Sequence, residues 1–360
     1  MAMELAAQLN SREFVLRNDP KGMYALFADF PNQVRKATEI ALNSDLPADS
    51  ENPGLVVLTG LGGSAAGGDF VKALFEESGS VPFLVNRDYH LPAYAGAANN
   101  TLVFACSYSG NTEETLSAYA DAKGKGAKII CVTSGGKLAE LAQADGNTVI
   151  LIPAGQPPRT ALGWMLMPVI IACSSMGLLP KQNVEALAKH LETRIQEWTI
   201  EVPHDSNEAK QLAVQLYGKF GVLYGLGGWQ GLVANRWKGQ INENSKNLVL
   251  NNTFPELNHN EILGWVQADR QSVGAYTGIL IEDGTESNKM KKRFAVTASI
   301  VEKICPFTTV QAKGNSLLER MLDAAVLGDF VSIYLAALND VDPENIDAIN
   351  VLKSELSKVQ

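Results

Sequence analysis

The chain has little of two residue types that build many functional sites, because its 360 residues include only four cysteines and four histidines. The cysteines are far apart, lie in apolar runs and form no Cys-x-x-Cys pair: Cys106, Cys131, Cys173 and Cys305. We therefore expect buried, reduced thiols. The histidines lack the His-Glu-x-x-His spacing of a zinc helix: His90, His190, His204 and His259. This pattern predicts a site without a metal ion.

The chain also lacks a surplus of basic residues and a long apolar run. Its net charge is -9, whereas a nucleic-acid partner requires a basic surface. A small anion needs only a local pocket of donors and stays possible. The longest apolar stretch, residues 164–173, is far shorter than the roughly 20 residues of a membrane span. The first residues show no basic segment followed by an apolar core, so we expect no signal peptide and a cytoplasmic location.

What is present is the pattern of an α/β protein. The length predicts two domains, and a hydrophobic content of 46% is enough for full cores. In the first half we predict strands over residues 55–59, 81–85, 101–105, 128–132 and 148–152, with helices between them over 65–76, 113–122 and 138–144. Apolar strands that alternate with helices are typical of parallel strands buried on both faces. The sequence therefore predicts a doubly wound α/β layer.

A second, similar series follows helices predicted over residues 162–179 and 184–198. Its strands are predicted over 221–224, 247–250, 274–281 and 308–311, and its helices over 230–242, 287–302, 316–338 and 343–358. Leu-Thr-Gly-Leu-Gly-Gly-Ser at 58–64 and Leu-Tyr-Gly-Leu-Gly-Gly-Trp at 223–229 occupy the same place in the two series. We infer a duplicated domain, although two unrelated glycine turns are the alternative. The predicted boundaries are a helical extension over 1–40, a first domain over 41–199 and a second over 205–360.

Two loops of the first half are candidates for anion binding. One is Gly60-Leu61-Gly62-Gly63-Ser64, and the other is Ser107-Tyr108-Ser109-Gly110-Asn111-Thr112. Ligands of open α/β sheets bind at the carboxyl ends of the strands, where helix N-termini favour negative charge. Either loop could instead be a simple capped turn, with Asn111 or Thr112 as the cap.

Nucleotide binding is the competing interpretation of the first loop. Gly60-x-Gly62 resembles the start of a dinucleotide fingerprint, and Asp88 lies the right distance further on to be its acidic residue. However, Ala65 stands where the third glycine belongs, and Asp88 follows Asn86-Arg87 and not a strand end directly. The Gly-Lys-Ser/Thr ending of a nucleoside-triphosphate loop is missing as well. The pattern therefore argues against a dinucleotide and against a nucleoside triphosphate.

The run Ser107-Tyr108-Ser109-Gly110-Asn111-Thr112-Glu113-Glu114 resembles the phosphate-binding loop of the sugar isomerase (SIS) family. Six segments in order resemble blocks of the bifunctional phosphoglucose/phosphomannose isomerases of that family: residues 60–68, 107–116, 156–163, 236–246, 255–265 and 313–320. The resemblance implies two duplicated, flavodoxin-like SIS domains. It also implies interconversion of glucose 6-phosphate, and of mannose 6-phosphate, with fructose 6-phosphate through a cis-enediolate, without metal or organic cofactor.

The resemblance also implies roles for residues of both halves. Those expected to bind the substrate phosphate are Gly63, Ser64, Ser107, Ser109 and Thr112. Arg159 is expected to offset the negative charge of the enediolate, as a permanent cation can. Glu243 occupies the position of the family's proton-transferring carboxylate. Taken without the family, Glu243 among basic residues is an ordinary solvated helix face.

His259 and Lys313 match the family residues that assist ring opening. Imidazole titrates near neutrality and so suits proton transfer to and from the ring oxygen, although a lone loop histidine often has no such role. In related isomerases this histidine reaches the neighbouring subunit's site, which implies a homodimer. Trp229 replaces Ser64 at the repeat-equivalent position, so we expect no second phosphate site. Thr308 and Thr309 do not match the spacing of the threonine that helps the family accept mannose.

Two alternatives stay open. SIS domains also serve as non-catalytic sugar-phosphate sensors, usually beside a DNA-binding domain, but residues 1–40 are too short to form one. An amino-sugar phosphate isomerase or a ligase-linked module is the other alternative. The blocks Asn242-Glu243-Asn244 and Asn258-His259-Asn260-Glu261 argue against it.

Overall fold

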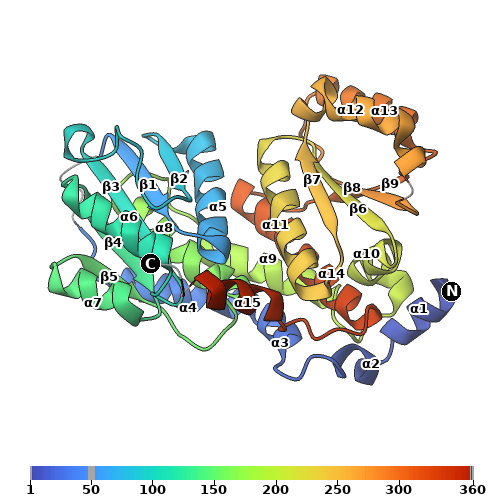
Figure 1. Cartoon of the computed structure of the whole chain (residues 1–360), viewed down its shortest axis with the longest axis horizontal. Coiled ribbons are helices and arrows are strands. Elements are labelled where there is room, and N and C mark those ends of the chain that lie inside the picture. Colours follow the sequence, from blue (N-terminus) through green and yellow to red (C-terminus); the bar gives the residue numbers. More distant parts are fainter. Residues whose placement is uncertain (1, 48–52, 272, 357, 359–360) are drawn as a thin grey trace. The chain divides into compact units, whose positions relative to one another are not determined.

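The computed structural model describes residues 2–47, 53–271, 273–356 and 358 (Figure 1). The chain forms two compact units, each with its own parallel sheet. The five-stranded unit comprises Asp29–Glu192 and Ser316–Glu319. The four-stranded unit comprises Met1–Ala28, Thr193–Asn315 and Arg320–Gln360. Each unit is therefore assembled from segments that are distant in the sequence.

The five-stranded unit confirms all the strands predicted for the first half. They are β1 (Leu55–Thr59), β2 (Phe83–Asn86), β3 (Thr101–Ser107), β4 (Lys128–Thr133) and β5 (Thr148–Leu151). All pairs are parallel, and the order across the sheet is β2-β1-β3-β4-β5. This is the flavodoxin-like order, in which the chain reverses its direction of winding between β1 and β3. Every residue of β1 and β3 is buried, as their apolar sequences predicted.

Helices cover both faces of this sheet, as expected for a doubly wound layer. They are α4 (Phe30–Leu42), α5 (Gly62–Ser78), α6 (Glu113–Gly124), α7 (Gly136–Ala144) and α8 (Leu162–Ser175). Tyr119 of α6 and Leu138 of α7 pack against Val57 and Val103, which point to that face. Helices α4 and α5 both pack on α8. Because successive strand residues alternate between faces, each face has its own apolar layer.

The four-stranded unit repeats this topology. Its strands are β6 (Phe220–Gly225), β7 (Val249–Thr253), β8 (Tyr276–Glu282) and β9 (Phe307–Gln311). They are parallel and follow the order β7-β6-β8-β9, which matches β2-β1-β3-β4. The two glycine-rich motifs end the equivalent strands β1 and β6 and lead into α5 and α11 (Gly228–Ser245). The predicted duplication is thereby confirmed.

The core of the four-stranded unit consists of a cluster of aromatic side chains and of the contact between two helices. On the aromatic side Tyr224, Phe254 and Trp265 pack beneath α13 (Asn288–Val301). The helix pair joins α11 to α14 (Leu317–Leu338), where the Trp237 indole N–H donates to the Ala324 carbonyl oxygen at 2.8 Å. Helix α14 is long and apolar enough to cross a membrane, but its apolar window is entirely buried. It is therefore a core helix of the fold.

The segment after β7 differs from the polar loop that the sequence predicted. It forms η4 (Glu256–His259), α12 (Glu261–Gly264) and η5 (Trp265–Gln271). Leu257 and Trp265 are buried, whereas Pro255, Glu256 and the residues around His259 are exposed or half-buried. Single helical turns with one or two anchoring side chains have no helical periodicity, so the sequence pattern did not reveal them.

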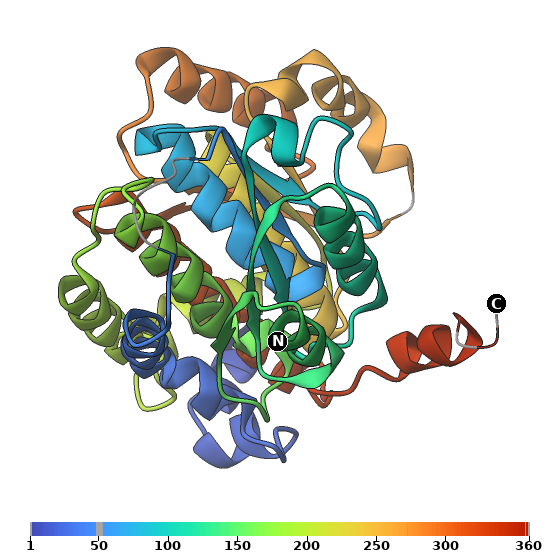
Figure 2. The same cartoon turned by 90° about the vertical axis from the view of Figure 1, so that its left-hand side faces the viewer.

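The remaining helices lie before, between and after the two sheets. They are α1 (Ala2–Leu9), α2 (Arg12–Leu16), α3 (Met23–Ala28), α9 (Val184–Gln196), α10 (Glu208–Leu216), α15 (Asp347–Leu356), and the single turns η1 (Ala97–Asn99), η2 (Pro158–Thr160) and η3 (His204–Ser206). The helix predicted over 343–358 begins later, because Asp342 and Asn345 accept backbone N–H groups in turns before it. Residue 357 lies outside the described residues. Helix α15 has no buried residue, and Figure 2 shows it leading to the C-terminus.

All four cysteines are buried and unpaired, as the sequence predicted. Burial raises the pKa of Cys131 and of Cys305 to about 12 in each case. Their thiols therefore stay protonated at neutral pH and serve as core side chains.

Candidate active site

The candidate phosphate site lies at the carboxyl ends of β1 and β3. These two strands are neighbours, with Thr59 paired to Ala105. The chain leaves β1 into α5 and leaves β3 into α6, so two helices begin beside one another at this edge. Backbone N–H groups and the positive ends of two helix dipoles thus favour an anion at this point of the sheet.

The hydroxyl groups of the second loop are held in place by the turn itself. Ser107 is buried at the end of β3, and its Oγ accepts the Gly110 N–H at 3.1 Å and lies 2.9 Å from the Thr112 hydroxyl. Ser109 is exposed, and its Oγ accepts the Asn111 N–H at 3.3 Å. Thr112 precedes the first residue of α6, yet its side chain makes no capping bond. Thr112 therefore does not cap α6, and the Asn111 Oδ1 accepts the Lys137 N–H of α7 at 3.1 Å instead.

The glycine loop is joined directly to the second loop. Ser64 is buried, and its Oγ accepts the Tyr108 N–H at 3.2 Å. A Cβ atom on Gly63 would lie 2.7 Å from the Pro158 carbonyl oxygen, so only glycine fits against this backbone. The same contact brings the turn that carries Arg159 beside the start of α5.

Arg159 belongs to η2 and is only 7% exposed. Its turn is fixed by neighbours within the five-stranded unit. Gln33 of α4 donates to the Thr160 carbonyl oxygen at 3.0 Å, and the Trp164 indole N–H donates to Gln156 Oε1 at 3.2 Å. The structure thus places Arg159 at the same edge as the two loops that are candidates for anion binding.

Tyr108 is a member of this site that the sequence did not reveal as structurally important. Its hydroxyl accepts the Gln156 N–H at 3.1 Å, and its carbonyl oxygen accepts the Ser134 N–H at 3.0 Å and the Ser134 hydroxyl at 2.6 Å. Burial raises the pKa of Tyr108. The only sequence signal was an aromatic residue between two serines at a strand end. Tyr108 joins three loops into one rigid edge.

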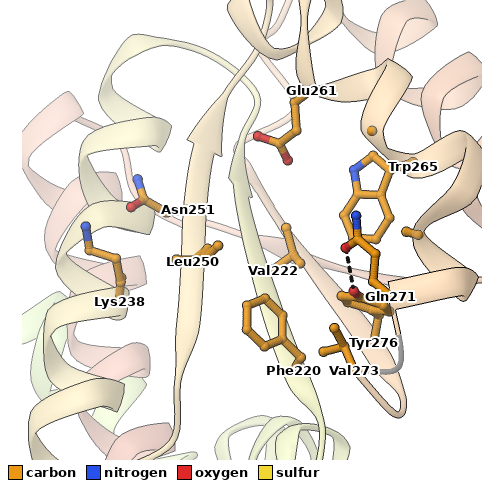
Figure 3. Close-up of a pocket in the computed structure, with 12 residues that line it drawn as sticks. Phe220, Val222, Lys238, Leu250, Asn251, Glu261, Trp265, Gln271, Val273 and Tyr276 are labelled. Atoms are coloured by element: carbon orange, nitrogen blue, oxygen red, sulfur yellow. Dashed lines mark hydrogen bonds between the residues drawn. The ribbon is translucent and has the colours of Figure 1, made fainter.

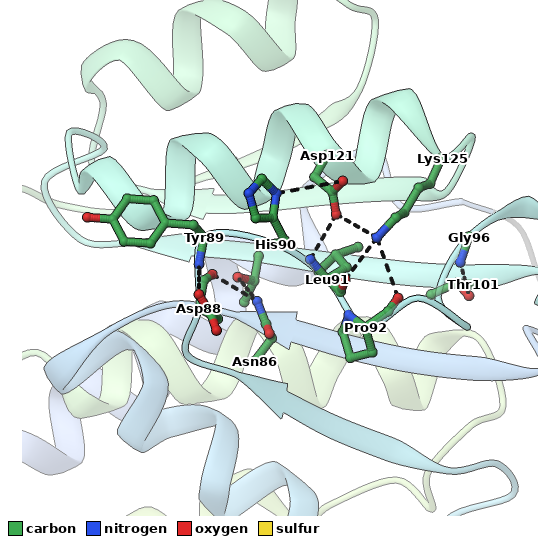
Figure 4. Close-up of polar contacts among 11 residues, drawn as sticks. Asn86, Asp88, Tyr89, His90, Leu91, Pro92, Gly96, Thr101, Asp121 and Lys125 are labelled. Carbon is green, nitrogen blue, oxygen red and sulfur yellow. Dashed lines mark hydrogen bonds and ion pairs between the residues drawn. The ribbon is translucent and has the colours of Figure 1, made fainter. Parts of the chain in front are cut away.

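The loop after β2 is fastened to the last turns of α6, away from the edge where that helix begins (Figure 4). Asp121 of α6 accepts the Leu91 N–H at 2.8 Å and the Lys125 ammonium group at 2.8 Å. Lys125 also donates to the Leu91 carbonyl oxygen at 2.8 Å. Burial opposes the ionised form of Asp121, but Lys125 and the Leu91 N–H outweigh it and lower the pKa of Asp121.

Asp88 is the acidic residue that the dinucleotide interpretation required. Its carboxylate accepts the backbone N–H of Tyr89 at 2.7 Å.

The remaining predicted residues lie in the four-stranded unit. Lys313 follows β9 and is exposed, with its backbone N–H donated to Asp323 at 2.9 Å. His259 ends η4 after β7 and is also exposed. β7 and β9 are the two outer strands of the four-stranded sheet. Three interstrand spacings separate them, which is about 14 Å.

Within the four-stranded unit, Glu243 lies far from the carboxyl ends of the strands, which His259 and Lys313 follow. Helix α11 begins at Gly228, just after the carboxyl end of β6, and Glu243 is fifteen positions further along. At about 1.5 Å per residue, this places Glu243 roughly 22 Å along the helix axis from its start. The four-stranded unit therefore does not by itself bring Glu243 together with His259 or Lys313.

The end of α11 around Glu243 is nevertheless firmly held. Asn244 donates to the Ser332 hydroxyl at 2.9 Å, and Asn339 donates to the Ser245 carbonyl oxygen at 2.8 Å. The Lys246 ammonium group donates to the Glu243 carbonyl oxygen at 2.7 Å. Two turns earlier in α11, the Arg236 guanidinium group contacts both carboxylate oxygens of Asp329 at 2.9 Å. Glu243 is half-buried on this fixed segment.

A separate cavity of about 410 Å³ lies in the same unit (Figure 3). Phe220 and Tyr276, the first residues of β6 and β8, are among its walls, so it opens near the amino ends of these strands. Trp265 and Leu250 complete its apolar surface. None of the predicted site residues lines this cavity, and it is distinct from the candidate site.

Within the described ranges, no three His, Cys, Asp or Glu side chains are grouped so that they could hold a metal ion. The candidate site is built instead from hydroxyl groups, backbone N–H groups and Arg159. These are donors for an oxyanion, and such a donor set suits a phosphate ester.

Fold and site together define a protein with two SIS domains. The sequence profile of the SIS domain matches residues 52–172, and that of the bacterial phospho-glucose isomerase C-terminal SIS domain matches residues 205–356. Among solved structures, a hypothetical protein from Thermus thermophilus has the same fold, with a TM-score of 0.73 and 16% identity over 99% of this chain and 94% of that one.

Curated relatives make the assignment narrower. A bifunctional phosphoglucose/phosphomannose isomerase of Caldicellulosiruptor bescii is 41% identical, over 94% of this chain and all of the relative. One from Aquifex aeolicus is 36% identical, over 84% of this chain and 90% of the relative. The chain belongs to the family of bifunctional phosphoglucose/phosphomannose isomerases, and it is an enzyme of the isomerase class.

Proposed function

We propose that this chain interconverts glucose 6-phosphate and fructose 6-phosphate, and also mannose 6-phosphate and fructose 6-phosphate. The observation that carries the proposal is the paired hydroxyl site of Ser107 and Thr112 between two helix N-termini. It supplies neutral donors and dipoles for a phosphate dianion and leaves the sugar free to react. Family membership supports the choice of a sugar phosphate as the substrate.

The phosphate is held by Gly63, Ser64, Ser107, Ser109 and Thr112. Ring opening moves a proton from the anomeric hydroxyl to the ring oxygen, and we assign this step to His259 and Lys313. Glu243 then removes the C2 proton and delivers it to C1, while the hydroxyl proton of O2 moves to O1, so that C2 becomes the carbonyl carbon. The intermediate is a cis-enediolate whose negative charge the Arg159 guanidinium offsets. Glucose and mannose 6-phosphates differ only at C2, which is planar in that intermediate, so both give the same enediolate.

The separation of Glu243 from the edge that carries His259 supports a site completed by a second copy of the chain. We propose a homodimer in which His259 enters the neighbouring subunit's site. His259 is exposed on a short helical turn, as a side chain that contacts another subunit must be in the isolated chain. We also propose a cytoplasmic location, where sugar phosphates and reduced thiols are both found.

The direct test is a coupled assay that detects fructose 6-phosphate formed from each aldose phosphate, with glucosamine 6-phosphate as a third substrate. We expect turnover of the first two. Glu243→Gln should lower kcat on the order of 10²–10⁴-fold while substrate binding persists, because only proton transfer is lost. Glu302→Gln, at an exposed glutamate after α13, is the matched control and should be fully active. Binding of sugar phosphate without turnover by the unaltered chain would identify a sensor instead.

Mixing two inactive variants tests the shared site. Glu243→Gln and His259→Ala subunits should form hybrid dimers in which one of the two sites has both residues intact. Random exchange of subunits then restores about a quarter of the full activity. If each site were built within one subunit, mixing would restore none, although both homodimers still formed.

A further inference from the structure

Helix α13 carries an unusual concentration of positive charge for a chain of net charge -9. Four of the five residues from 289 to 293 are lysine or arginine, and α13 contains no acidic residue. Lys289, Lys292 and Arg293 are spaced i, i+3 and i+4, which places them on one face of the helix. Among the described residues, no carboxylate forms an ion pair with any of the three.

These three cations line a hollow of about 430 Å³. Its opposite wall comes from η4 and α12, and α12 lies beside α13 in Figure 1. Asn258 and Ile262 belong to that wall, and Val296 adds an apolar surface from α13. Asn258 donates to the Thr297 hydroxyl at 2.8 Å, and Arg293 donates to Asn258 at 3.5 Å. The walls are thus connected, and no acidic residue lines the space.

The stability of the fold does not explain this arrangement. Cations in the first turns of a helix oppose its dipole, and three of them on one face repel one another. A solvated helix face usually mixes both signs, whereas here one sign surrounds a hollow. Side chains placed against local preference in this way are typical of a functional site.

We propose that this hollow binds a small phosphorylated molecule that carries two anionic groups, at a site separate from the Ser107 loop. Neighbouring positions on one helix face are about 5–6 Å apart. The cations are therefore spread over more than the width of one phosphate. Ile262 and Val296 provide apolar contact for the carbon skeleton between the two charged groups. A bisphosphate or a pyrophosphate ester has this chemistry.

The test uses inorganic pyrophosphate as the probe and calorimetric titration of the full chain. The Ser107→Ala, Thr112→Ala double variant serves as the starting protein, so that the phosphate loop does not contribute. We expect one binding event per chain. Adding Lys289→Gln and Lys292→Gln should weaken it at least about tenfold, as expected when hydrogen bonds to a charged group are lost. The matched control adds Lys353→Gln and Lys358→Gln to the same starting protein. It should leave the affinity for pyrophosphate unchanged.

Two results would overturn the proposal. Equal loss of affinity in the control variant would show general attraction to surface lysines, and absence of any binding would show that the hollow is not an anion site. In the second case, sedimentation shows whether Lys289→Gln with Lys292→Gln dissociates an assembly, which would assign the cations to contact between two copies. Isomerase activity is not the readout, so the outcome is independent of the proposed reaction.

Discussion

The hydroxyl oxygens of Ser107 and Thr112 lie 2.9 Å apart across the turn that joins β3 to α6. Ser107 is fixed by the Gly110 N–H, and Thr112 is directed to Ser107 and away from the capping position of its own helix. The first backbone N–H groups of α6 are therefore left for a ligand. This relationship is the reason why we propose an anion site at a loop that resembles an ordinary helix start.

Replacing Ser107 and Thr112 by alanine should weaken substrate binding while the chemistry persists. Each hydroxyl is expected to contribute a hydrogen bond to a charged group, about 1.5–3 kcal/mol, so KM for glucose 6-phosphate should rise roughly tenfold or more for each change. Steady-state kinetics measure this rise. Ser78→Ala, at the far end of α5, is the matched control. A fall in kcat at unchanged KM would contradict the assignment.

Gly63 provides a test of how closely Arg159 depends on the glycine loop. The Cβ atom of Gly63→Ala would lie 2.7 Å from the Pro158 carbonyl oxygen, and a backbone atom cannot move aside cheaply. We expect a loss of stability of about 1–3 kcal/mol and a fall in kcat/KM, because the turn that carries Arg159 is displaced. Gly124→Ala meets nothing within 4 Å and is the control. Chemical unfolding and the coupled assay should separate the two variants.

The sequence predicted the inner strands of each sheet well because they are buried on both faces. β1 and β3 are short, mainly apolar runs rich in β-branched and aromatic residues, which is typical of a strand buried on both faces. The glycine motifs at β1 and β6 also predicted the duplication, since positive-φ or closely packed glycines mark the same turn in both units. Gly60 shows why, because a Cβ there would lie 2.7 Å from the Cys106 carbonyl oxygen.

What the sequence did not predict depends on contacts between distant segments. Tyr108 gains its role from Gln156 and Ser134, which lie in two other loops. The turns η4, α12 and η5 exist because Leu257 and Trp265 find buried positions on the sheet, which local periodicity cannot show. The predicted catalytic set came from family resemblance, and Glu243 shows why the fold of the four-stranded unit alone does not assemble it. Its helix carries it away from the edge where His259 and Lys313 lie.

Lys210 should make stability depend on pH in the alkaline range. It is fully buried, and its ammonium group donates to the carbonyl oxygens of Ile200 and Val202 at 2.7 Å each. Burial lowers the pKa of Lys210 to about 8. The unfolded chain keeps this proton up to a pH of about 10.4, so the unfolded state binds more protons in between and stability rises with pH.

Lys210→Met removes this dependence. We expect the free energy of unfolding of the unaltered chain to rise relative to that of Lys210→Met between pH 8 and about 10, by about 3 kcal/mol at most. Urea unfolding of both proteins at several pH values measures the difference. Parallel curves would show that the buried ammonium group keeps an ordinary pKa.

Lys246 should act as a positioning residue for Glu243. It ends α11 in the left-handed region, with φ of 53°, and its ammonium group donates to the carbonyl oxygens of Glu243 at 2.7 Å and Asp342 at 2.8 Å. These bonds satisfy the end of the helix and tie it to the segment after α14. Without them the last turn frays, and the Glu243 carboxylate no longer occupies one position relative to the sugar.

Lys246→Met should therefore lower kcat about tenfold and leave KM nearly unchanged, because the residues that we propose to hold the phosphate lie in the other unit. A misplacement of about 1 Å in a catalytic group is enough for such a loss. Lys291→Met is the matched control, since Lys291 also donates to a backbone carbonyl oxygen, that of Gly284 at 2.6 Å, but lies outside the end of α11. Lys246 donates to more carbonyl oxygens than Lys291, so urea unfolding measures the stability that each variant loses. A loss of kcat confined to Lys246→Met, while both variants stay folded, isolates positioning from folding. Equal losses of kcat in both would mean that Lys246 supports the fold alone.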